Sequence, residues 1–151
     1  MYHFAYGSNM NINELKKYIL CKNIIVVGIG YLDNHVFRYR YIKNRKLSAK
    51  ANIEPYKNSK VYGIIFKITG SLNKLHKKEG IFNNTYYIRH YNITLTKSLN
   101  ITNKKLKCFV YVMEPDRIGN IGKPSKLYKM NIIKSAAYYN FPSQYIRTKL
   151  Y

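Results

Sequence analysis

Only six acidic side chains are present in the 151 residues, so each can be weighed as a candidate proton donor or acceptor. They are Glu14, Asp33, Glu54, Glu79, Glu114 and Asp116. Glu14 falls in the first turns of an expected helix, where it favours the helix dipole, and three others fall in turns or at a strand exit. Glu54 is left undecided. Glu79 falls where a predicted helix meets a loop, so its side chain can be held rigidly and turned inward; it is the best catalytic candidate.

Several other chemistries lack the residues they need. Paired-carboxylate hydrolysis of glycosides is disfavoured because no second acid has a setting like that of Glu79. Ser8 stands in Gly-Ser-Asn rather than in the G-x-S-x-G turn that presents a nucleophile. Cys21 and Cys108 form no CxxC pair, and with four scattered histidines they make no metal-binding spacing. We therefore expect no metal site, and we expect both cysteines to be buried apolar positions.

A short polar loop offers a different kind of site. Gly7, Ser8 and Asn9 follow an apolar segment and precede a predicted helix. Successive backbone N–H groups at such a position can bind a carboxylate or a developing oxyanion.

The composition indicates a globular protein with a strong positive charge. Hydrophobic residues make up 46% of the chain, and 27 Lys+Arg against 6 Asp+Glu give a net charge of +21. Such a charge ordinarily favours polyanion binding. However, the cations are scattered, and the abundance of Lys, Asn, Ile and Tyr together is what an adenine- and thymine-rich genome produces by codon bias. Dedicated nucleic-acid binding is therefore disfavoured.

The hydropathy pattern predicts a protein outside the membrane. No segment approaches 18 consecutive apolar residues, and the N-terminus lacks the basic and apolar regions of a signal peptide. We expect a soluble protein in the reducing cytoplasm, and a single domain over residues 1–151.

The N-terminal half is expected to supply strands and one helix. Residues 2–6 read as a short strand, and Asn11 or Asn13 can cap a helix that runs through Leu20. Residues 23–32 and 35–42 are expected to form a hairpin around Asp33-Asn34. Residues 61–68 form an apolar central strand, in which Gly63 indicates a bulge or a close backbone approach.

The C-terminal half is expected to position Glu79 and to complete an α+β domain. Ser71 can cap a short helix that carries Leu72 and Leu75 on one face and ends before Gly80. Strands are expected over 85–96 and 107–113, a helix over 124–139, and a final helical turn after Pro142. These elements predict one α+β domain around a twisted, partly closed sheet.

The residues resemble a known family along nearly the whole chain. The opening segment 4–10, Phe-Ala-Tyr-Gly-Ser-Asn-Met, is similar to the signature loop of the γ-glutamylcyclotransferases. Further matches follow in order: Ala51-Asn52-Ile53 with Pro55, Val61-Tyr62-Gly63-Ile64, Leu75 with Glu79-Gly80, Tyr86, Tyr111, Pro124-Ser125 with Tyr128, and the tail 136–142 with Tyr145. The resemblance implies a mixed parallel/antiparallel β-barrel flanked by α-helices, with the loop and the glutamate facing one cavity.

The resemblance also implies an activity and a set of site residues. Glu79 would be the general acid/base in the cyclisation of a γ-glutamyl compound to 5-oxoproline, without a metal or other cofactor. The substrate-binding residues would be Tyr6, Gly7, Ser8, Asn9, Met10, Tyr86, Tyr111 and Tyr128. The Ser8-Asn9 form of the loop favours γ-glutamyl amino acids over γ-glutamylamines or glutathione. The partner would be this small molecule, and the chain would be a monomer or a homodimer.

Three departures from the family pattern keep alternatives open. His76 stands where the family commonly has Asp, and Asn84 and Asn140 stand where glycines are usual. Asn tolerates a positive φ, so we expect the backbone to survive both changes. Besides an active cyclotransferase, the alternatives are a catalytically altered binding module and a protein that binds RNA or another polyanion.

Overall fold

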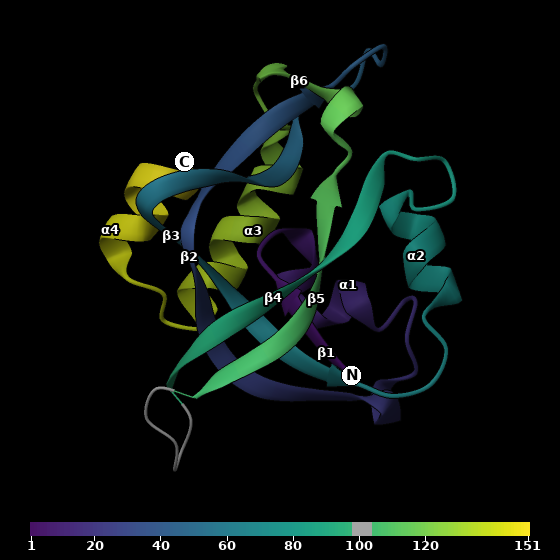
Figure 1. Cartoon of the computed structure of the whole chain (residues 1–151), viewed down its shortest axis with the longest axis vertical. Helices are drawn as coiled ribbons and strands as arrows, with labels where there is room; N and C mark the ends of the chain where they lie inside the picture. The colour runs from purple at the N-terminus through teal and green to yellow at the C-terminus, as the bar shows by residue number, and fades with distance from the viewer. Residues whose placement is uncertain (98–103) are drawn as a thin grey trace.

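The computed structural model describes residues 1–97 and 104–151, so residues 98–103 of the predicted domain lie outside the described part. The described residues form a six-stranded sheet and several short helices (Figure 1). The strands are β1 (Tyr2–Ala5), β2 (Ile24–Ile42), β3 (Lys50–Ile68), β4 (Tyr86–Lys97), β5 (Lys105–Met113) and β6 (Ile118–Ile121). The α-helices are α1 (Ile12–Leu15), α2 (Asn73–Glu79), α3 (Lys126–Tyr138) and α4 (Ser143–Tyr145), which continues as a π-helix over Ile146–Leu150.

The sheet closes into a mixed barrel. The strand order is β3-β1-β5-β4-β2, and β2 also pairs with β3, which closes the ring; β6 adds to β2 on the outside. β1 runs parallel to β5, whereas the other pairs are antiparallel. Closure leaves these five strands without a free edge. The predicted mixed barrel flanked by helices is confirmed.

The hairpin expected around Asp33-Asn34 is wrong. β2 continues through this point as one strand, and its partners on β3 change from Lys60, opposite Asp33, to Pro55, opposite His35. Asn34 has a φ of +56°, and its side-chain oxygen accepts a hydrogen bond from the Asn58 N–H at 3.1 Å. A single left-handed Asn kinks a strand, whereas a two-residue reversal needs both central residues to turn. The Asp33-Asn34 pair therefore marks a shift in the pairing register of β2 and β3 rather than a chain reversal.

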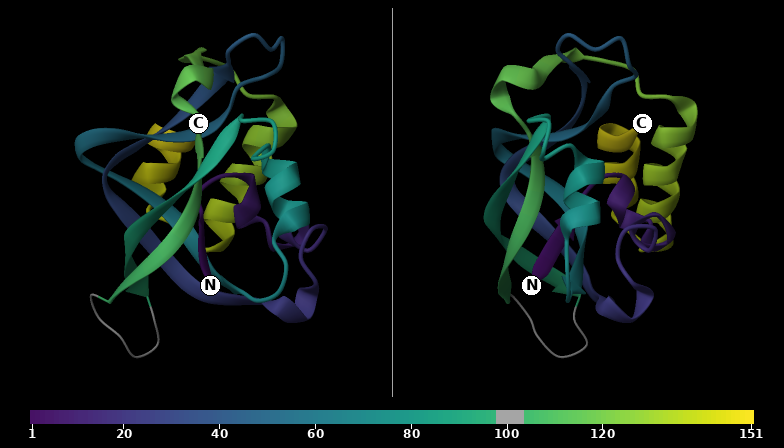
Figure 2. Two further views of the ribbon diagram at one scale, coloured as in Figure 1. Left: turned by 45° about the vertical axis from the view of Figure 1, so that its right-hand side comes forward. Right: turned by 90° about the vertical axis from the view of Figure 1, so that its right-hand side faces the viewer.

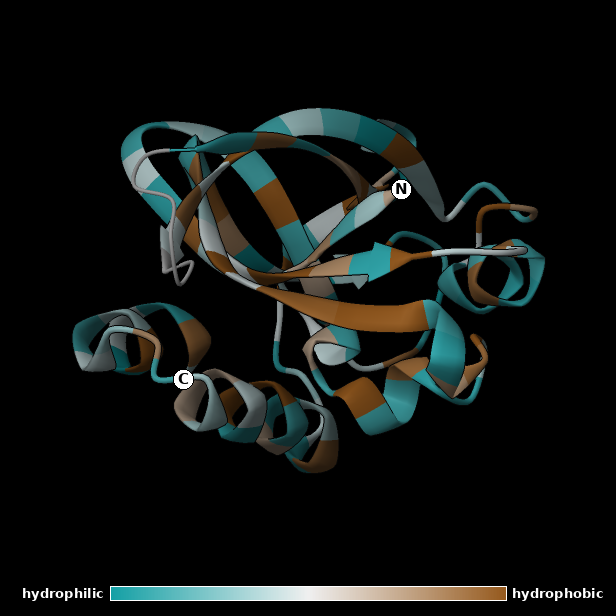
Figure 3. Ribbon diagram, turned by 90° about the horizontal axis from the view of Figure 1, so that it is seen from below, coloured by the Kyte–Doolittle hydropathy of each residue, from teal (hydrophilic) through white to brown (hydrophobic). Residues whose placement is uncertain are grey.

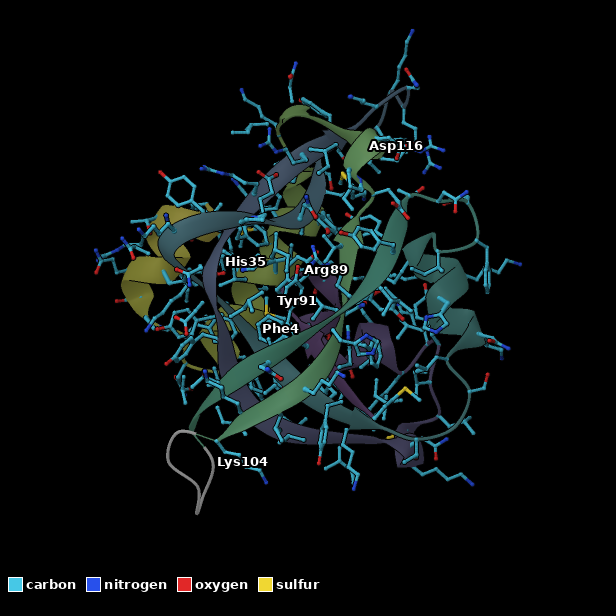
Figure 4. All side chains as sticks on the ribbon, viewed as in Figure 1. Phe4, His35, Arg89, Tyr91, Lys104 and Asp116 are labelled. Carbon is cyan, nitrogen blue, oxygen red and sulfur yellow. The ribbon has the colours of Figure 1, made fainter. Side chains whose placement is uncertain are left out.

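Gly63 makes the close approach that its place in an apolar strand predicted. A Cβ atom at this position would lie 2.5 Å from Cε2 of Phe4 and 2.6 Å from the Ala5 carbonyl oxygen. β1 lies against this part of β3, with Ala5 opposite Ile64. Phe4 is completely buried and lies near the middle of the molecule in Figure 4. The glycine therefore lets β1, which is a barrel strand and leads into the signature loop, pack tightly against β3.

Helices cover one side of the barrel. α3 and the C-terminal helical segment form a layer next to the strands (Figures 2 and 3). Ile132 and Ala136 of α3 are completely buried, as is Leu150 at the end of the chain. Figure 3 shows this helical layer on one side of the strands, with hydrophobic positions along its helices. Among the described residues, no helix combines the length and apolar character needed to cross a membrane.

Two local expectations need correction. The first helix ends at Leu15 rather than Leu20, because the N–H groups of Lys17 and Tyr18 bond three residues back and the chain tightens into turns. Cys21 is exposed, since it stands in a surface 3₁₀ turn, whereas Cys108 is buried as expected.

Candidate active site

Helix α2 places Glu79 on the side of the helix that faces the protein. Leu72, Leu75 and Glu79 follow one another at spacings of three and four residues, so they share one face. Leu75 is completely buried and anchors that face. Gly80 then ends the helix with a φ of +79°, and the N–H of Ile81 bonds back to the His76 carbonyl at 3.1 Å. This C-terminal cap fixes the last helical residue, which is Glu79.

The carboxylate of Glu79 is held by two neighbours through one of its oxygens. Nδ2 of Asn9 donates to Oε1 at 3.0 Å, and Nζ of Lys78 donates to the same oxygen at 2.5 Å. Lys78 also donates to Oδ1 of Asn9 at 2.8 Å, which closes a triangle. The Glu79 side chain is 14% exposed. Both hydrogen bonds that the described residues make to the carboxylate fall on Oε1, which leaves Oε2 without a protein donor among these residues.

The signature loop lies opposite this carboxylate. After β1, residues Ser8–Met10 form a 3₁₀ turn in which the N–H of Met10 bonds to the Gly7 carbonyl at 3.0 Å. The first N–H groups of such a turn have no acceptor within it. They are therefore free to bind an oxygen of a ligand in the space between loop and helix.

Loop, helix and barrel line one open cavity with a volume of about 330 Å³, open solvent included. Eight of the nine residues predicted for the site contribute to its lining: Tyr6, Gly7, Ser8, Asn9, Glu79, Tyr86, Tyr111 and Tyr128. Met10 does not line it, because its side chain is completely buried in the hydrophobic core. The remaining lining residues are His3, Phe4, Ala5 and Ala51.

The tyrosine hydroxyl groups of the cavity differ in their hydrogen-bond partners. Tyr6 donates to the Tyr111 carbonyl at 2.6 Å, and Tyr86 donates to the Ala51 carbonyl at 2.7 Å. Tyr128 instead accepts a hydrogen bond from the Ala51 N–H at 3.2 Å. Tyr6 and Tyr86 are thus committed to backbone carbonyl groups, whereas the Tyr128 hydroxyl accepts from a backbone N–H and lies beside the Ser8 side chain.

Burial keeps these phenols protonated at neutral pH. It raises the pKa of Tyr6, Tyr86 and Tyr111 well above the usual value, and the nearby Glu79 charge raises it further. For Tyr128, burial raises the pKa to about 12, although hydrogen bonding with the Ala51 backbone and the Ser8 side chain lowers it in part. The cavity therefore presents neutral hydroxyl groups around a single carboxylate.

His76, which departs from the family pattern, bonds to a tyrosine rather than to Glu79. Its Nδ1 lies 2.8 Å from the Tyr111 hydroxyl oxygen, so this phenol has a protein partner. Burial lowers the pKa of His76, which favours the neutral imidazole. The histidine replaces a nearby negative charge with a neutral group that orients Tyr111.

His3 is a cavity residue that sequence reasoning missed. Its Nδ1 lies 3.2 Å from the Phe109 carbonyl oxygen, and its ring stacks on Phe109 with 4.7 Å between centroids. Since a carbonyl only accepts, Nδ1 carries the proton and Nε2 is a bare acceptor. Nε2 is buried and has no hydrogen-bond partner among the described residues. Burial lowers the pKa of His3 to about 4.

Comparison with solved structures identifies the fold as that of the γ-glutamyl cyclotransferases. A structure described as a gamma-glutamyl cyclotransferase superposes with a TM-score of 0.83 at 20% identity, over 97% of this chain and 84% of the other. An uncharacterised human protein gives a TM-score of 0.78 at 22% identity, over 97% and 83%. A yeast gamma-glutamyl cyclotransferase specific to glutathione gives 0.69 at 10% identity, over 99% and 93%.

The sequence itself places the chain in a family. Residues 60–148 match the model of the AIG2-like family, and the chain therefore belongs to it. No curated protein matches in a direct sequence search. Within the described ranges, no three His, Cys, Asp or Glu side chains gather as a metal site would require.

Proposed function

We propose that this protein is a γ-glutamylcyclotransferase that converts γ-glutamyl amino acids or peptides to 5-oxoproline and a free amine. The proposal is supported chiefly by the carboxylate of Glu79, which is fixed at Oε1, open at Oε2 and directed at the cavity under the signature loop. The fold shared with the cyclotransferases supports it further.

The reaction needs one group that accepts a proton and then returns it. Glu79 takes a proton from the α-ammonium of the substrate, and the freed amine attacks the γ-carbonyl carbon. A new C–N bond closes the five-membered ring, and Glu79 gives its proton to the departing nitrogen as the original amide C–N bond breaks. The ring nitrogen loses a second proton, which passes to the released amine, so that the amine leaves as an ammonium. No water is consumed. Because the nucleophile and the carbonyl belong to one molecule, folding the substrate supplies most of the rate enhancement.

The other cavity residues bind and orient the substrate. The N–H groups of residues 7–9 accommodate a substrate carboxylate or the oxyanion that develops on the γ-carbonyl. Tyr128 donates its hydroxyl proton to a second oxygen. The bare Nε2 of His3 accepts a hydrogen bond from a substrate N–H group.

The proposal is tested by measuring 5-oxoproline release from a panel of γ-glutamyl dipeptides with Glu79→Gln. This change keeps the size of the side chain and removes its base, so we expect kcat to fall by roughly a thousand-fold or more. Glu114→Gln is the matched control, since Glu114 does not line the cavity. A folded Glu79→Gln protein that keeps its rate would refute the assigned role.

A further inference from the structure

A second, wider hollow opens directly from the cavity that contains Glu79. It encloses about 1320 Å³, open solvent included, and shares Ser8, Glu79, Tyr86 and Tyr128 with the cavity. Its walls come chiefly from α2, the first turns of α3 and the start of β3. We call this hollow the vestibule. A substrate whose γ-glutamyl end fills the cavity must extend its leaving part into it.

Cations dominate the vestibule. Arg45, Lys50, Lys77 and Lys78 line it, together with the acids Glu14 and Glu79. Both acids already have partners, because Glu14 pairs with Lys17 at 2.6 Å and Glu79 pairs with Lys78. Within residues 1–97 and 104–151, no carboxylate forms an ion pair with the other three cations. The vestibule therefore has an uncompensated positive charge next to the reacting groups.

Lys50 is a vestibule cation next to the boundary of the two hollows and, unlike Lys78, it forms no ion pair among the described residues. It precedes Ala51, whose backbone groups bond to Tyr86 and Tyr128, and its Nζ lies 4.4 Å from the centre of the Tyr128 ring. The side chain is half-buried, and burial and the charge of Lys78 lower the pKa of Lys50, although the charge of Glu79 opposes this shift in part. A half-buried ammonium without a carboxylate partner is stabilised by an anion that binds beside it.

We infer that the vestibule binds the carboxylates of an anionic leaving part, so that the preferred substrates are γ-glutamyl compounds with acidic leaving groups, of which γ-linked glutamate oligomers are the extended case. This inference rests on the proposed function and names the substrate class of the same site. Three unpaired cations match the several carboxylates of such an oligomer, whereas a neutral alkylamine would leave them without a partner.

An oligomer has a further chemical consequence. Cyclisation of its first residue releases one 5-oxoproline and a chain that is one glutamate shorter. The bond broken is the γ-amide, so the shortened chain begins with a new free α-amine and is itself a substrate. Repeated turnover degrades the oligomer from its amino end until a single glutamate remains.

The kinetic test compares leaving parts that differ in charge. We expect kcat/KM for 5-oxoproline release to rise from γ-glutamyl-ethylamide to γ-glutamyl-alanine, γ-glutamyl-glutamate and γ-linked triglutamate. The gain is roughly two- to five-fold per carboxylate at low ionic strength and shrinks with added salt. Lys50→Gln should reduce the ratio of triglutamate to ethylamide, whereas Lys60→Gln should not.

Lys60 is a matched control for Lys50. It is exposed, lines neither hollow and also lies over a tyrosine ring, with 4.2 Å from Nζ to the centre of Tyr31. Equal kcat/KM across the series, or equal ratios in wild type and Lys50→Gln, would overturn the inference while leaving the proposed cyclisation intact.

A binding measurement separates failure of the inference from failure of the proposed function. N-acetylated γ-linked triglutamate cannot cyclise, because its α-amine is blocked. Calorimetry should detect salt-sensitive binding that Lys50→Gln weakens by roughly three-fold or more and Lys60→Gln leaves unchanged. Such binding without turnover of any substrate would overturn the proposed function alone, and absence of binding to the wild type would overturn the inference.

Discussion

Asn9 connects the signature loop to the catalytic candidate. Its side-chain amide is buried and bonds to both Glu79 and Lys78. Asn9→Ala removes both hydrogen bonds, each made to a charged group, and leaves the carboxylate free to rotate toward Lys78. We expect kcat/KM for 5-oxoproline release to fall roughly ten- to hundred-fold, with a loss of about 1–3 kcal/mol in the free energy of unfolding.

The control for this prediction is Asn92→Ala, since Asn92 is an exposed residue of β4. Circular dichroism of both variants shows whether the fold is retained. Unchanged kcat/KM in a folded Asn9→Ala protein would mean that Glu79 needs no support from the loop.

His3 predicts a specific acid sensitivity. In the folded protein its pKa is about 4, against 6.5 for the ordinary group, so the unfolded state binds more protons between these values. Stability is therefore lost as the pH falls below about 6.5, by roughly 2 kcal/mol at about pH 5. His3→Phe removes this titration. Urea unfolding at about pH 7 and pH 5 should show a smaller acid loss in the variant, and an equal loss would exclude His3 as its source.

At this scale, the sequence indicated most of the residues around the cavity but not the bonds between them. Glu79 and the loop could be found from their positions in chain order. The triangle of Asn9, Lys78 and Glu79 depends on α2 meeting the loop across 70 residues of sequence. His3 could not be found, because its role depends on the parallel pairing of β1 with β5 that brings the Phe109 carbonyl to its ring.

At the scale of elements, the C-terminal cap of α2 fixes the direction of the Glu79 side chain. Gly80 has a positive φ, and a Cβ there would lie 2.9 Å from Oδ1 of Asn83 and 3.1 Å from Cβ of Thr85. Gly80→Ala should cost about 1–3 kcal/mol of unfolding free energy, because alanine is strained at a positive φ and its Cβ has no room. It should also lower kcat, because a shift of the cap displaces the adjacent Glu79. Chemical denaturation and initial rates measure the two effects.

Asn84→Gly is the companion variant. Asn84 has a φ of +55°, so glycine fits there and stability should change by less than about 1 kcal/mol. If Gly80→Ala were as stable and active as this companion, the cap would have no part in placing Glu79.

Elements with both a start and a stop signal were predicted well. α2 ends before Gly80 as predicted, although its N-cap is Leu72 rather than Ser71, and α3 begins after Pro124 with Ser125 as its N-cap. The positive φ of Asn84 and Asn140 likewise agrees with their place at glycine positions of the family. β2 was divided wrongly because Asp33-Asn34 is locally a good turn, and its pairing with 15 positions of β3 overrides that preference.

At the scale of the whole molecule, the positive charge is spread rather than gathered. Figure 4 shows nitrogen-tipped side chains pointing outward around the outline of the molecule. A dedicated nucleic-acid surface concentrates its cations on one face or along one groove. The local excess of cations in the vestibule is a feature of the active-site entrance, and it accords with a small anionic ligand better than with a polynucleotide.

The closed barrel explains why the site can be rigid in a protein of this size. β1 is paired on both sides, with β3 and β5, and it leads directly into the signature loop. α2 joins β3 to β4, so the glutamate and the loop are both attached to neighbouring parts of one closed sheet. The resemblance indicated this barrel, whereas local patterns alone predicted only a twisted, partly closed sheet, because closure depends on long-range pairing.

The central claim is that the γ-amide is opened by the substrate's own amine. The most direct test incubates the protein with γ-glutamyl-alanine in ¹⁸O-labelled water and analyses the products by mass spectrometry. Intramolecular cyclisation predicts unlabelled 5-oxoproline and alanine in equal amounts, with release abolished in Glu79→Gln. Labelled glutamate as the product would show hydrolysis instead, and no product from a folded wild-type protein would contradict the proposed activity.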